Sequence, residues 1–325
     1  MAKVENSLRK LSEKTGFSAS TISRVINHPD IVKESTRKAV FSYIEQNMIP
    51  LPQPLTVRRQ VIGLTFSDAS SLFTASIISA LEEQLAKTSY QLLLFNLQER
   101  IDVYAYFIEH LDYLKKIDGL FITSTTLSPE GSSFFKKMGI PVVLFHSSCP
   151  GEECILTNNF KGGQDAAKYM LSRGYKSLAF VKWFPNDEHI QDRYLGFTSI
   201  CPIDDEHCAS APLSAQGGYE ATRKLMETCH HSPDAIFFGC DAMAAGGIRY
   251  MREHNINVNR DVGIMGFDNL PIAELMGITT MSQFVDSKIP FAVTYLLDRI
   301  KSSTPMPMND EISITPKLVI RTSLK

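Results

Sequence analysis

The clearest hydrophobic pattern lies near the N-terminus, where residues 7–27 predict two short helices joined by a tight turn. In the second helix the apolar residues Ile22, Val25 and Ile26 repeat at helical spacing and would face a small core. The opposite face of that helix is polar and carries one positive charge, from Ser20, Ser23, Arg24 and Asn27. The pattern therefore predicts an amphipathic helix with a slim polar face.

Capping and turn residues mark the ends of these helices. Ser7 and Ser18 are the expected N-caps, and Gly16 is expected in a left-handed turn between the helices. The second helix should end at residues 27–29, Asn-His-Pro, and a third should follow over about 33–47. A small three-helix domain is predicted.

After residue 60 short apolar runs alternate with amphipathic stretches. The runs, each a predicted strand, are VIGLTF (61–66), YQLLLF (90–95), GLFIT (119–123), PVVLF (141–145), SLAFV (177–181), AIFFG (235–239) and VGIMGF (262–267). Helices are predicted near 74–88, 101–116, 130–138, 162–173, 215–229, 241–254 and 286–301. Such alternation is typical of parallel sheets covered on both faces, and its length favours two similar halves with a ligand site at the carboxyl ends of the strands.

Charge is distributed unevenly over the 325 residues. Residues 1–60 hold ten Lys and Arg against five Asp and Glu, whereas the remainder holds 23 basic and 30 acidic residues. A basic end on an acidic body suits a DNA-facing module joined to a body that does not bind DNA. The slim polar helix face would fit the major groove, with Arg24 placed to reach a guanine edge. A helical domain with no role in nucleic-acid binding is the alternative that the pattern leaves open.

Several function classes have no support in the sequence. No GxSxG, Walker loop, Rossmann glycine fingerprint or metal-ligand cluster is present, so we expect no enzyme activity, cofactor or metal. The six cysteines form no CxxC pair and the N-terminus carries no signal peptide, which indicates free thiols in a cytoplasmic protein. No apolar run is long enough to cross a membrane.

Two consecutive motifs, SLRKLSEKTGFSASTISRVIN and VKESTRKAVFSYIEQ, resemble the DNA-binding headpiece of the lactose-repressor (LacI/GalR) family of bacterial transcription regulators. The resemblance continues to the C-terminus through IGLTFSDASSLFTASII, TNNFKGGQDAAKYMLSRGYKSLAFV, DRYLGF, DAIFFGCDAMAAGGIRYMREHNINVNRDVGIMGFDN, TTMSQ and PKLVIRTS. It implies an all-α helix-turn-helix headpiece plus an α/β core of two doubly wound parallel-sheet subdomains of the periplasmic-binding-protein type I fold.

The resemblance also implies a domain organisation. The headpiece would occupy 1–47, a Pro-rich linker 48–60, and an effector-binding and dimerisation core 61–325. Within the core, the N-subdomain would hold about 61–156 and 285–316, and the C-subdomain about 157–284 and 317–325. The chain would cross between the subdomains near 156–158, 284–286 and 316–318.

The family's functional positions can be carried onto this sequence residue by residue. The DNA-binding set implied is Ser7, Ser18, Ala19, Ser20, Thr21, Ser23, Arg24, Asn27 and Leu55. The effector-binding set implied is Asp68, Ser70, Phe73, His146, Arg193, Phe237, Cys240 and Asp268. Arg193 would supply a planar donor fork and Asp268 a carboxylate for hydroxyl groups, whereas Phe237 has the alternative of serving only as core. We interpret Asp241 as an N-cap and exclude it from the set.

Three departures from the family pattern bear on the effector. Cys240 stands where sugar-binding relatives often carry Asn or Ser, His146 where Arg is common, and Asn158-Asn159 where Asp-Asn is usual. A sugar, a sugar phosphate, a nucleobase or nucleoside, and a pocket that has lost its ligand all stay open.

The linker is short and contains prolines at positions 50, 52 and 54. Prolines disfavour the hinge helix that family members insert into the minor groove, so Leu55 is a doubtful wedge between bases. Arg58 and Arg59 could still meet phosphates. The hypothesis is that minor-groove kinking is weak and that electrostatics carries more of the affinity.

The function implied is a DNA-binding transcriptional regulator, most simply a repressor. A homodimer would read a near-palindromic operator, and a small-molecule effector, a sugar or sugar derivative, would bind between the core subdomains. Control by a protein co-repressor is an alternative, as is a solute-binding receptor of the same core fold.

Overall fold

The computed structural model describes residues 12, 15–27, 32–46, 59–98, 102–123, 127–149, 152, 154–184, 187–301 and 311–325. The chain divides into two compact units. Unit 1 comprises Met1–Asp68, Glu82–Cys154 and Ala292–Glu311, and unit 2 comprises Ala69–Leu81, Ile155–Phe291 and Ile312–Lys325.

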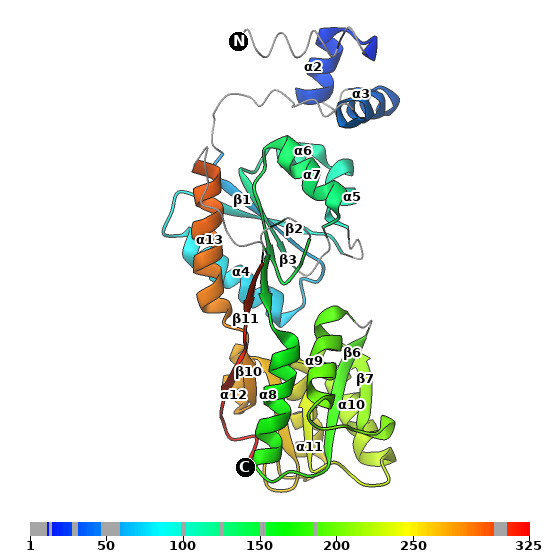
Figure 1. Cartoon of the computed structure of the whole chain (residues 1–325), viewed down its shortest axis with the longest axis vertical. Coiled ribbons are helices and arrows are strands. Elements are labelled where there is room, and N and C mark those ends of the chain that lie inside the picture. The colour runs from blue at the N-terminus through cyan, green and yellow to red at the C-terminus, as the bar shows by residue number, and fades with distance from the viewer. Residues whose placement is uncertain are drawn as a thin grey trace. The chain divides into compact units, whose positions relative to one another are not determined.

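Two helices of the N-terminal region are described, α2 (Ala19–Asn27) and α3 (Glu34–Gln46) (Figure 1). They match the second and third predicted helices closely. Gly16 has φ of 74°, as the turn prediction requires. Ile22, Val25 and Val40 are buried, which gives the two helices a common apolar contact.

The first sheet has the strand order β11-β5-β4-β3-β1-β2. Its strands are β1 (Val61–Phe66), β2 (Gln91–Asn96), β3 (Gly119–Thr123), β4 (Val142–Phe145), β5 (Cys154–Thr157) and β11 (Glu311–Ile314). The accompanying helices are α4 (Leu72–Leu85), α5 (Val103–Glu109), α6 (Leu111–Leu114), α7 (Pro129–Met138) and α13 (Val285–Lys301). Strand β1 pairs in parallel with β2 and β3, and every residue of β3 and β4 is buried.

The second sheet repeats the arrangement in unit 2, with the order β12-β10-β9-β8-β6-β7. Its strands are β6 (Leu178–Phe184), β7 (Cys208–Pro212), β8 (Ala235–Phe238), β9 (Gly263–Asp268), β10 (Thr279–Ser282) and β12 (Lys317–Val319). The helices are α8 (Asn159–Ser172), α9 (Glu188–Thr198), α10 (Ala215–Thr228), α11 (Asp241–Glu253) and α12 (Pro271–Met276), with a 3-10 turn, η2 (Asp205–His207). All pairings are parallel except β10 with β12. The two doubly wound sheets and the helical N-terminal segment confirm the predicted fold class.

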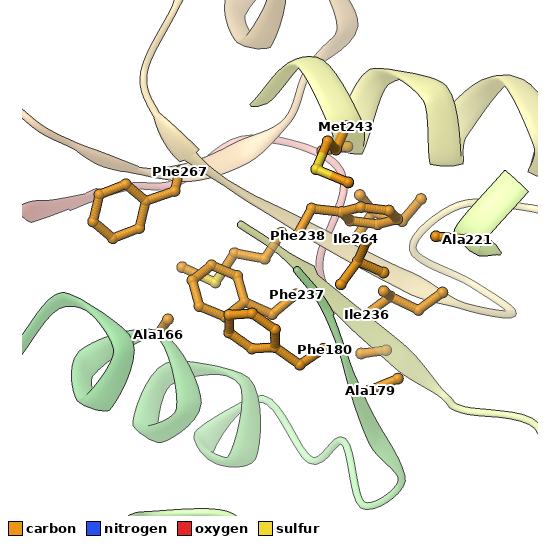
Figure 2. Packing of buried hydrophobic residues seen from close by; sticks show 14 of the residues in the cluster. Ala166, Ala179, Phe180, Ala221, Ile236, Phe237, Phe238, Met243, Ile264 and Phe267 are labelled. Carbon is orange, nitrogen blue, oxygen red and sulfur yellow. The ribbon is translucent and has the colours of Figure 1, made fainter. Parts of the chain in front are cut away.

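The core of unit 2 lies on both faces of this sheet. Figure 2 shows Ala166 of α8 on one side of the strands and Met243 of α11 on the other. Phe180 and Phe237 pack edge to face with centroids 5.2 Å apart, a geometry that aromatic quadrupoles favour. Continuous burial on both faces explains why these strands read as unbroken apolar runs.

Glycines allow the helices that cover this sheet to approach closely. A Cβ at Gly163 of α8 would overlap the carbonyl oxygen of Arg193, and a Cβ at Gly196 of α9 would overlap the carbonyl oxygen of Phe160. Gly218 and Gly246 hold α10 and α11 together in the same reciprocal way. The position of α9, which carries Arg193, therefore depends on glycine at both Gly163 and Gly196.

Several elements differ from the sequence prediction. The single helix predicted over 101–116 is broken at His110 into α5 and α6. Helices α9 and α12 and strands β5, β7, β10, β11 and β12 were not predicted as elements.

The linker hypothesis falls on residues 48–58, which lie outside the described residues. Arg59 is described, and its side chain donates to the carbonyl oxygen of Ile117 at 3.1 Å while its backbone N–H donates to Asp118. These bonds tie the start of β1 to the loop before β3. Of the residues that the structure describes, no helix is long and apolar enough to cross a membrane.

Candidate functional site

Helix α2 presents the polar face that the sequence predicts. Ser18 caps the helix, because its Oγ accepts the backbone N–H of Thr21 at 3.1 Å. The same Oγ lies 2.8 Å from the hydroxyls of Ser20 and Thr21, so the three hydroxyls form one cluster at the helix N-terminus. Ser20 and Arg24 are exposed, opposite the buried Ile22 and Val25.

The remaining predicted DNA-binding residues are described less fully. Ala19, Ser23 and Asn27 lie in α2, but their side chains are outside the described part of the structure. Ser7 and Leu55 lie outside the described residues altogether.

A second polar site is centred on Arg193 and Asp268 in unit 2. Arg193 is on α9 and Asp268 ends β9, and both are at least nine-tenths buried. The Nη1 atom of Arg193 lies 3.8 Å from Asp268 Oδ1, and the guanidinium stacks 3.8 Å from the ring centroid of Phe267. Arg193 also donates from Nε to Asn159 Oδ1 at 2.7 Å and from Nη1 to the carbonyl oxygen of Gly239. A buried guanidinium is tolerated because these acceptors replace its water shell.

Burial shifts the pKa values of both groups toward their neutral forms. It lowers the pKa of Arg193 and raises that of Asp268, and the attraction between the two charges opposes both shifts. Asp268 has φ of 117° and the following Asn269 has φ of 63°, conformations that non-glycine residues rarely adopt. Strained backbone of this kind concentrates at binding sites.

A continuous hydrogen-bonded chain extends from Asp268 to a buried lysine. Gln283 donates from Nε2 to Asp268 Oδ1, and Thr157 donates from Oγ1 to Gln283 Oε1 at 2.7 Å. Lys288 Nζ donates to Thr157 Oγ1 at 2.7 Å and to the carbonyl oxygen of Leu156 at 3.4 Å. Every donor in the chain Lys288–Thr157–Gln283–Asp268 points toward the carboxylate.

Asp241 does not cap α11. Cys240 occupies the N-cap position, and Asp241 is the first residue of the helix. Its carboxylate accepts the backbone N–H of Leu270 at 2.8 Å and the hydroxyl of Thr280 at 2.6 Å, so it joins three elements of unit 2. The N-cap interpretation is therefore wrong. The sequence could not show that the Asp241 side chain points into unit 2 instead of toward the N–H groups of its own helix.

The other predicted effector residues lie in varied surroundings. Phe237 is fully buried in the core of unit 2, the alternative that the sequence left open (Figure 2). Cys240 is also buried, and burial together with Asp268 raises the pKa of its thiol, which stays protonated at neutral pH. His146 is buried at the end of β4 with φ of 53°. In the loop after β1, Asp68 and Ser70 are exposed, and Phe73 in α4 is half-buried. Arg193, Cys240 and Asp268 thus come together.

Comparison with known proteins gives this geometry a context. A family model described as a periplasmic binding protein-like domain matches residues 167–324. The chain is 27% identical over 333 residues to the HTH-type transcriptional repressor PurR of Actinobacillus pleuropneumoniae, with 98% of each chain covered. It is also 27% identical over 335 residues to PurR of Yersinia pestis, covering 98% of this chain and 96% of that one.

Solved structures agree. A LacI family transcriptional regulator from Enterococcus faecium with bound ribose matches with a TM-score of 0.71 and 26% identity, covering 81% of this chain and 98% of that one. The chain is thus similar to HTH-type transcriptional repressors over nearly its whole length and to a LacI family regulator over its core. The transcriptional regulator CelR in complex with cellobiose, at 21% identity, shares the fold with a TM-score of 0.70 and coverage of 97% and 99%.

Sequence reasoning missed four members of the polar site in this chain: Asn159, Thr157, Gln283 and Lys288. One signal was available, because Lys288 repeats at helical spacing with Ala292 and Leu296, which are fully buried in α13. A lysine on an apolar stripe indicates a buried charge. Asn159 is the first residue of α8, Thr157 ends β5 and Gln283 follows β10, positions where no periodicity distinguishes them.

Lys288 should make the stability of this protein depend on pH in the alkaline range. Burial, with a smaller contribution from Arg193, lowers the pKa of Lys288 to about 7 from its ordinary value of 10.5. Because the unfolded chain then binds more protons between these values, the unfolding free energy should rise from pH 7 to pH 10. We expect the Lys288 contribution to be about 1 kcal/mol per pH unit.

Urea unfolding of the wild type and of Lys288→Met, at unit steps from pH 6 to pH 10, measures this contribution. The variant should be the more stable protein at pH 7, and its advantage should shrink toward pH 10. Lys168→Met, at an exposed position of α8, is the control and should track the wild type. A constant difference between wild type and Lys288→Met across this range would contradict the prediction.

Proposed function

We propose that this chain is a sequence-specific DNA-binding transcriptional repressor whose operator binding is modulated by a small molecule. The observation that carries the proposal is the capped, amphipathic α2, with Arg24 and Ser20 exposed opposite the buried Ile22 and Val25. The repressors to which the chain is similar support it. The proposed organisation is a headpiece at 1–47, a linker at 48–60 and a core at 61–325, acting as a homodimer.

The mechanism proposed for DNA places α2 in the major groove. Arg24, Ser20 and Ala19 would face base edges, and an arginine there can donate two hydrogen bonds to guanine. Phosphate contacts, which fix register without reading sequence, are proposed for Ser7, Ser18, Thr21, Ser23 and Asn27. Leu55 is retained as the candidate minor-groove wedge. Two headpieces of a dimer would read half-sites on the order of 34 Å apart.

The proposed effector site is Arg193 with Asp268. The hydrogen bonds that the described residues make with Arg193 use Nε and Nη1, and those made with the Asp268 carboxylate use Oδ1. Nη2 of the arginine and Oδ2 of the aspartate therefore stay available as a donor and an acceptor. Adjacent hydroxyl groups, each both donor and acceptor, would satisfy both atoms.

We infer that the effector is a sugar or a sugar derivative. The donor–acceptor pair at Arg193 and Asp268 supports this, as do the ribose and cellobiose bound in the related structures. Cys240, whose thiol is neutral, offers little for hydrogen bonding beside that pair. The polar recognition would therefore rest on Arg193, Asp268 and their hydrogen-bonded supports.

The DNA-binding proposal is tested with Arg24→Ala. Fragments that the purified protein selects from a random DNA pool define its operator, and fluorescence anisotropy then measures affinity. We expect the substitution to cost about 1–3 kcal/mol and to relax selection at one base position in each half-site. Arg223→Ala, at an ion-paired surface arginine of α10, is the matched control and should bind as the wild type does.

Other outcomes would redirect the proposal. A chain that selects no sequence and shows no salt-dependent binding would be a solute-binding receptor instead. Operator binding that no small molecule changes would favour control by a protein co-repressor.

A further inference from the structure

Lys288 is the least expected residue of the polar site in unit 2. It lies near the start of α13 and is only 2% exposed. Lysine normally extends its ammonium group to water, and burying that charge is costly unless an anion or several acceptors surround it. Its presence on the apolar stripe of α13 therefore calls for a partner.

The protein supplies only part of that partnership. The ammonium group has three N–H donors, and the structure gives it two acceptors, Thr157 Oγ1 and the carbonyl oxygen of Leu156. Among the described side chains, no carboxylate lies within the 4 Å ion-pair distance of Lys288. Among the described residues, one donor therefore has no acceptor, and the charge of the protonated form has no counter-ion.

The nearest carboxylate of the hydrogen-bonded chain cannot move to Lys288 without breaking other bonds. Asp268 Oδ1 is engaged by Gln283 and paired with Arg193. Asp241 is held by Leu270 and Thr280. Arg193, in contrast, is close enough to lower the pKa of Lys288 by repulsion. Since Asp241 is held in this way, Asp268 is the one carboxylate among these described residues that serves two basic side chains, Arg193 directly and Lys288 through the hydrogen-bonded chain.

A purely structural role explains less. Hydrogen bonds from Lys288 to Thr157 and Leu156 could fasten the start of α13 to the end of β5, but a neutral amide could do the same without burying a charge. A charge without a counter-ion is expected instead where a ligand brings the counter-ion, because the buried cation then strengthens the interaction.

We propose that Lys288 recognises an acidic group, a phosphate or a carboxylate, on the small molecule that binds at Arg193 and Asp268. The inference rests on the proposed effector site and narrows its ligand to an anionic sugar derivative. The hydroxyls would engage Arg193 and Asp268, while the acidic group would take the third N–H of Lys288. The chain through Thr157 and Gln283 holds that ammonium at a fixed place relative to Asp268.

The test compares three ligands that differ only in the group at C5 of the sugar: ribose, with a hydroxyl, ribose 5-phosphate, with a phosphate, and riburonate, with a carboxylate. Calorimetry with the full chain measures their dissociation constants for the wild type, Lys288→Met and Lys288→Arg. We expect the wild type to prefer at least one of the acidic ligands over ribose by tenfold or more. Lys288→Met should lose that preference and keep its affinity for ribose, whereas Lys288→Arg, which retains the cation, should keep most of the preference.

The two acidic ligands separate the phosphate from the carboxylate. The proposal is overturned if neither binds the wild type more tightly than it binds Lys288→Met, and this includes the case in which none of the three ligands binds. A separate experiment tests the proposed effector site at Arg193 and Asp268. If a panel of neutral metabolites stabilises the wild type but not an Arg193 variant, the effector site stands and only the anion preference is wrong.

Discussion

Replacing Arg193 by methionine is expected to lower the free energy of unfolding by about 3–5 kcal/mol. The substitution leaves the Asp268 carboxylate buried without its cation and removes the donors to Asn159 and Gly239. Methionine fills a similar volume, so the loss reports mainly on the charge and the hydrogen bonds. Response to the effector should be lost as well, because the donor fork is gone.

Urea unfolding at pH 8 and pH 5 measures the effect and identifies its cause. Burial already raises the pKa of Asp268, and without Arg193 the pKa should rise further. The native state would then bind a proton that the unfolded state does not, so stability should fall as pH rises. The loss should therefore be smaller at pH 5 than at pH 8. Equal losses at the two pH values would show that packing, not charge, dominates.

The double variant Arg193→Met with Asp268→Leu is the matched control. Removing both charges leaves no unpaired ion, so the double variant should be more stable than the sum of the two single losses predicts. Additive losses would argue against direct coupling between the two side chains. Neither Arg193→Met nor the double variant should respond to the effector. Recovery of stability without recovery of the response would show that the two effects are distinct.

Gly196→Ala should destabilise the protein by about 3 kcal/mol, at the upper end of the range for overpacking. Alanine is the better helix former by about 1 kcal/mol, so propensity alone predicts the opposite sign. The close approach decides, because the added methyl group would overlap the backbone carbonyl of Phe160 and backbone cannot move aside as a side chain can. Helices α8 and α9 would have to separate.

The displacement should also reach the site, since Arg193 lies on α9 one turn before Gly196. We expect weaker effector binding in Gly196→Ala, measured by calorimetry, together with the lower unfolding free energy. Asp192→Ala, at an exposed position of the same helix, is the control and should change neither quantity appreciably. A Gly196→Ala variant as stable as the wild type would show that α9 can shift at little cost.

The fold could be predicted where strands are buried on both faces, because such strands are continuous apolar runs. VIGLTF and GLFIT coincide with β1 and β3 residue for residue. Helix α9 was missed for the opposite reason. Two of its four buried residues are Arg193 and Gly196, so only half of its inward positions are hydrophobic. Arg193, the candidate ligand residue, and Gly196, which allows close packing, are the residues that interrupt the hydrophobic periodicity of the helix.

Strands β7 and β10 were missed for a similar reason. Strand β7, CASAP, is built from small residues with alternating burial, and β10, TTMS, buries two threonines. Their stability comes from neighbours far away in the sequence, such as the antiparallel pairing of β10 with β12. Local pattern carries little of that information.

The candidate site likewise contains some residues that local sequence motifs indicate and others that only the folded structure brings together. Arg193 and Asp268 could be located from the motifs DRYLGF and GFDN, which carry part of the resemblance to the LacI/GalR family. The chain through Gln283, Thr157 and Lys288 could not, because it brings together β5, β9, β10 and α13 only after folding. Asp241 was misplaced because its direction depends on α12 and β10, not on α11.

The strands β11 and β12 carry a consequence for the order in which the protein folds. Both come from residues after 310, yet β11 completes the first sheet and β12 completes the second. Ser323 adds to this, because its hydroxyl joins β9 to β10 by bonding Ile264 and Thr279. Each sheet therefore lacks one edge strand until this segment has been made. The two halves should therefore wait, incomplete, until the segment has been made and released, and chaperones would meet them in that state.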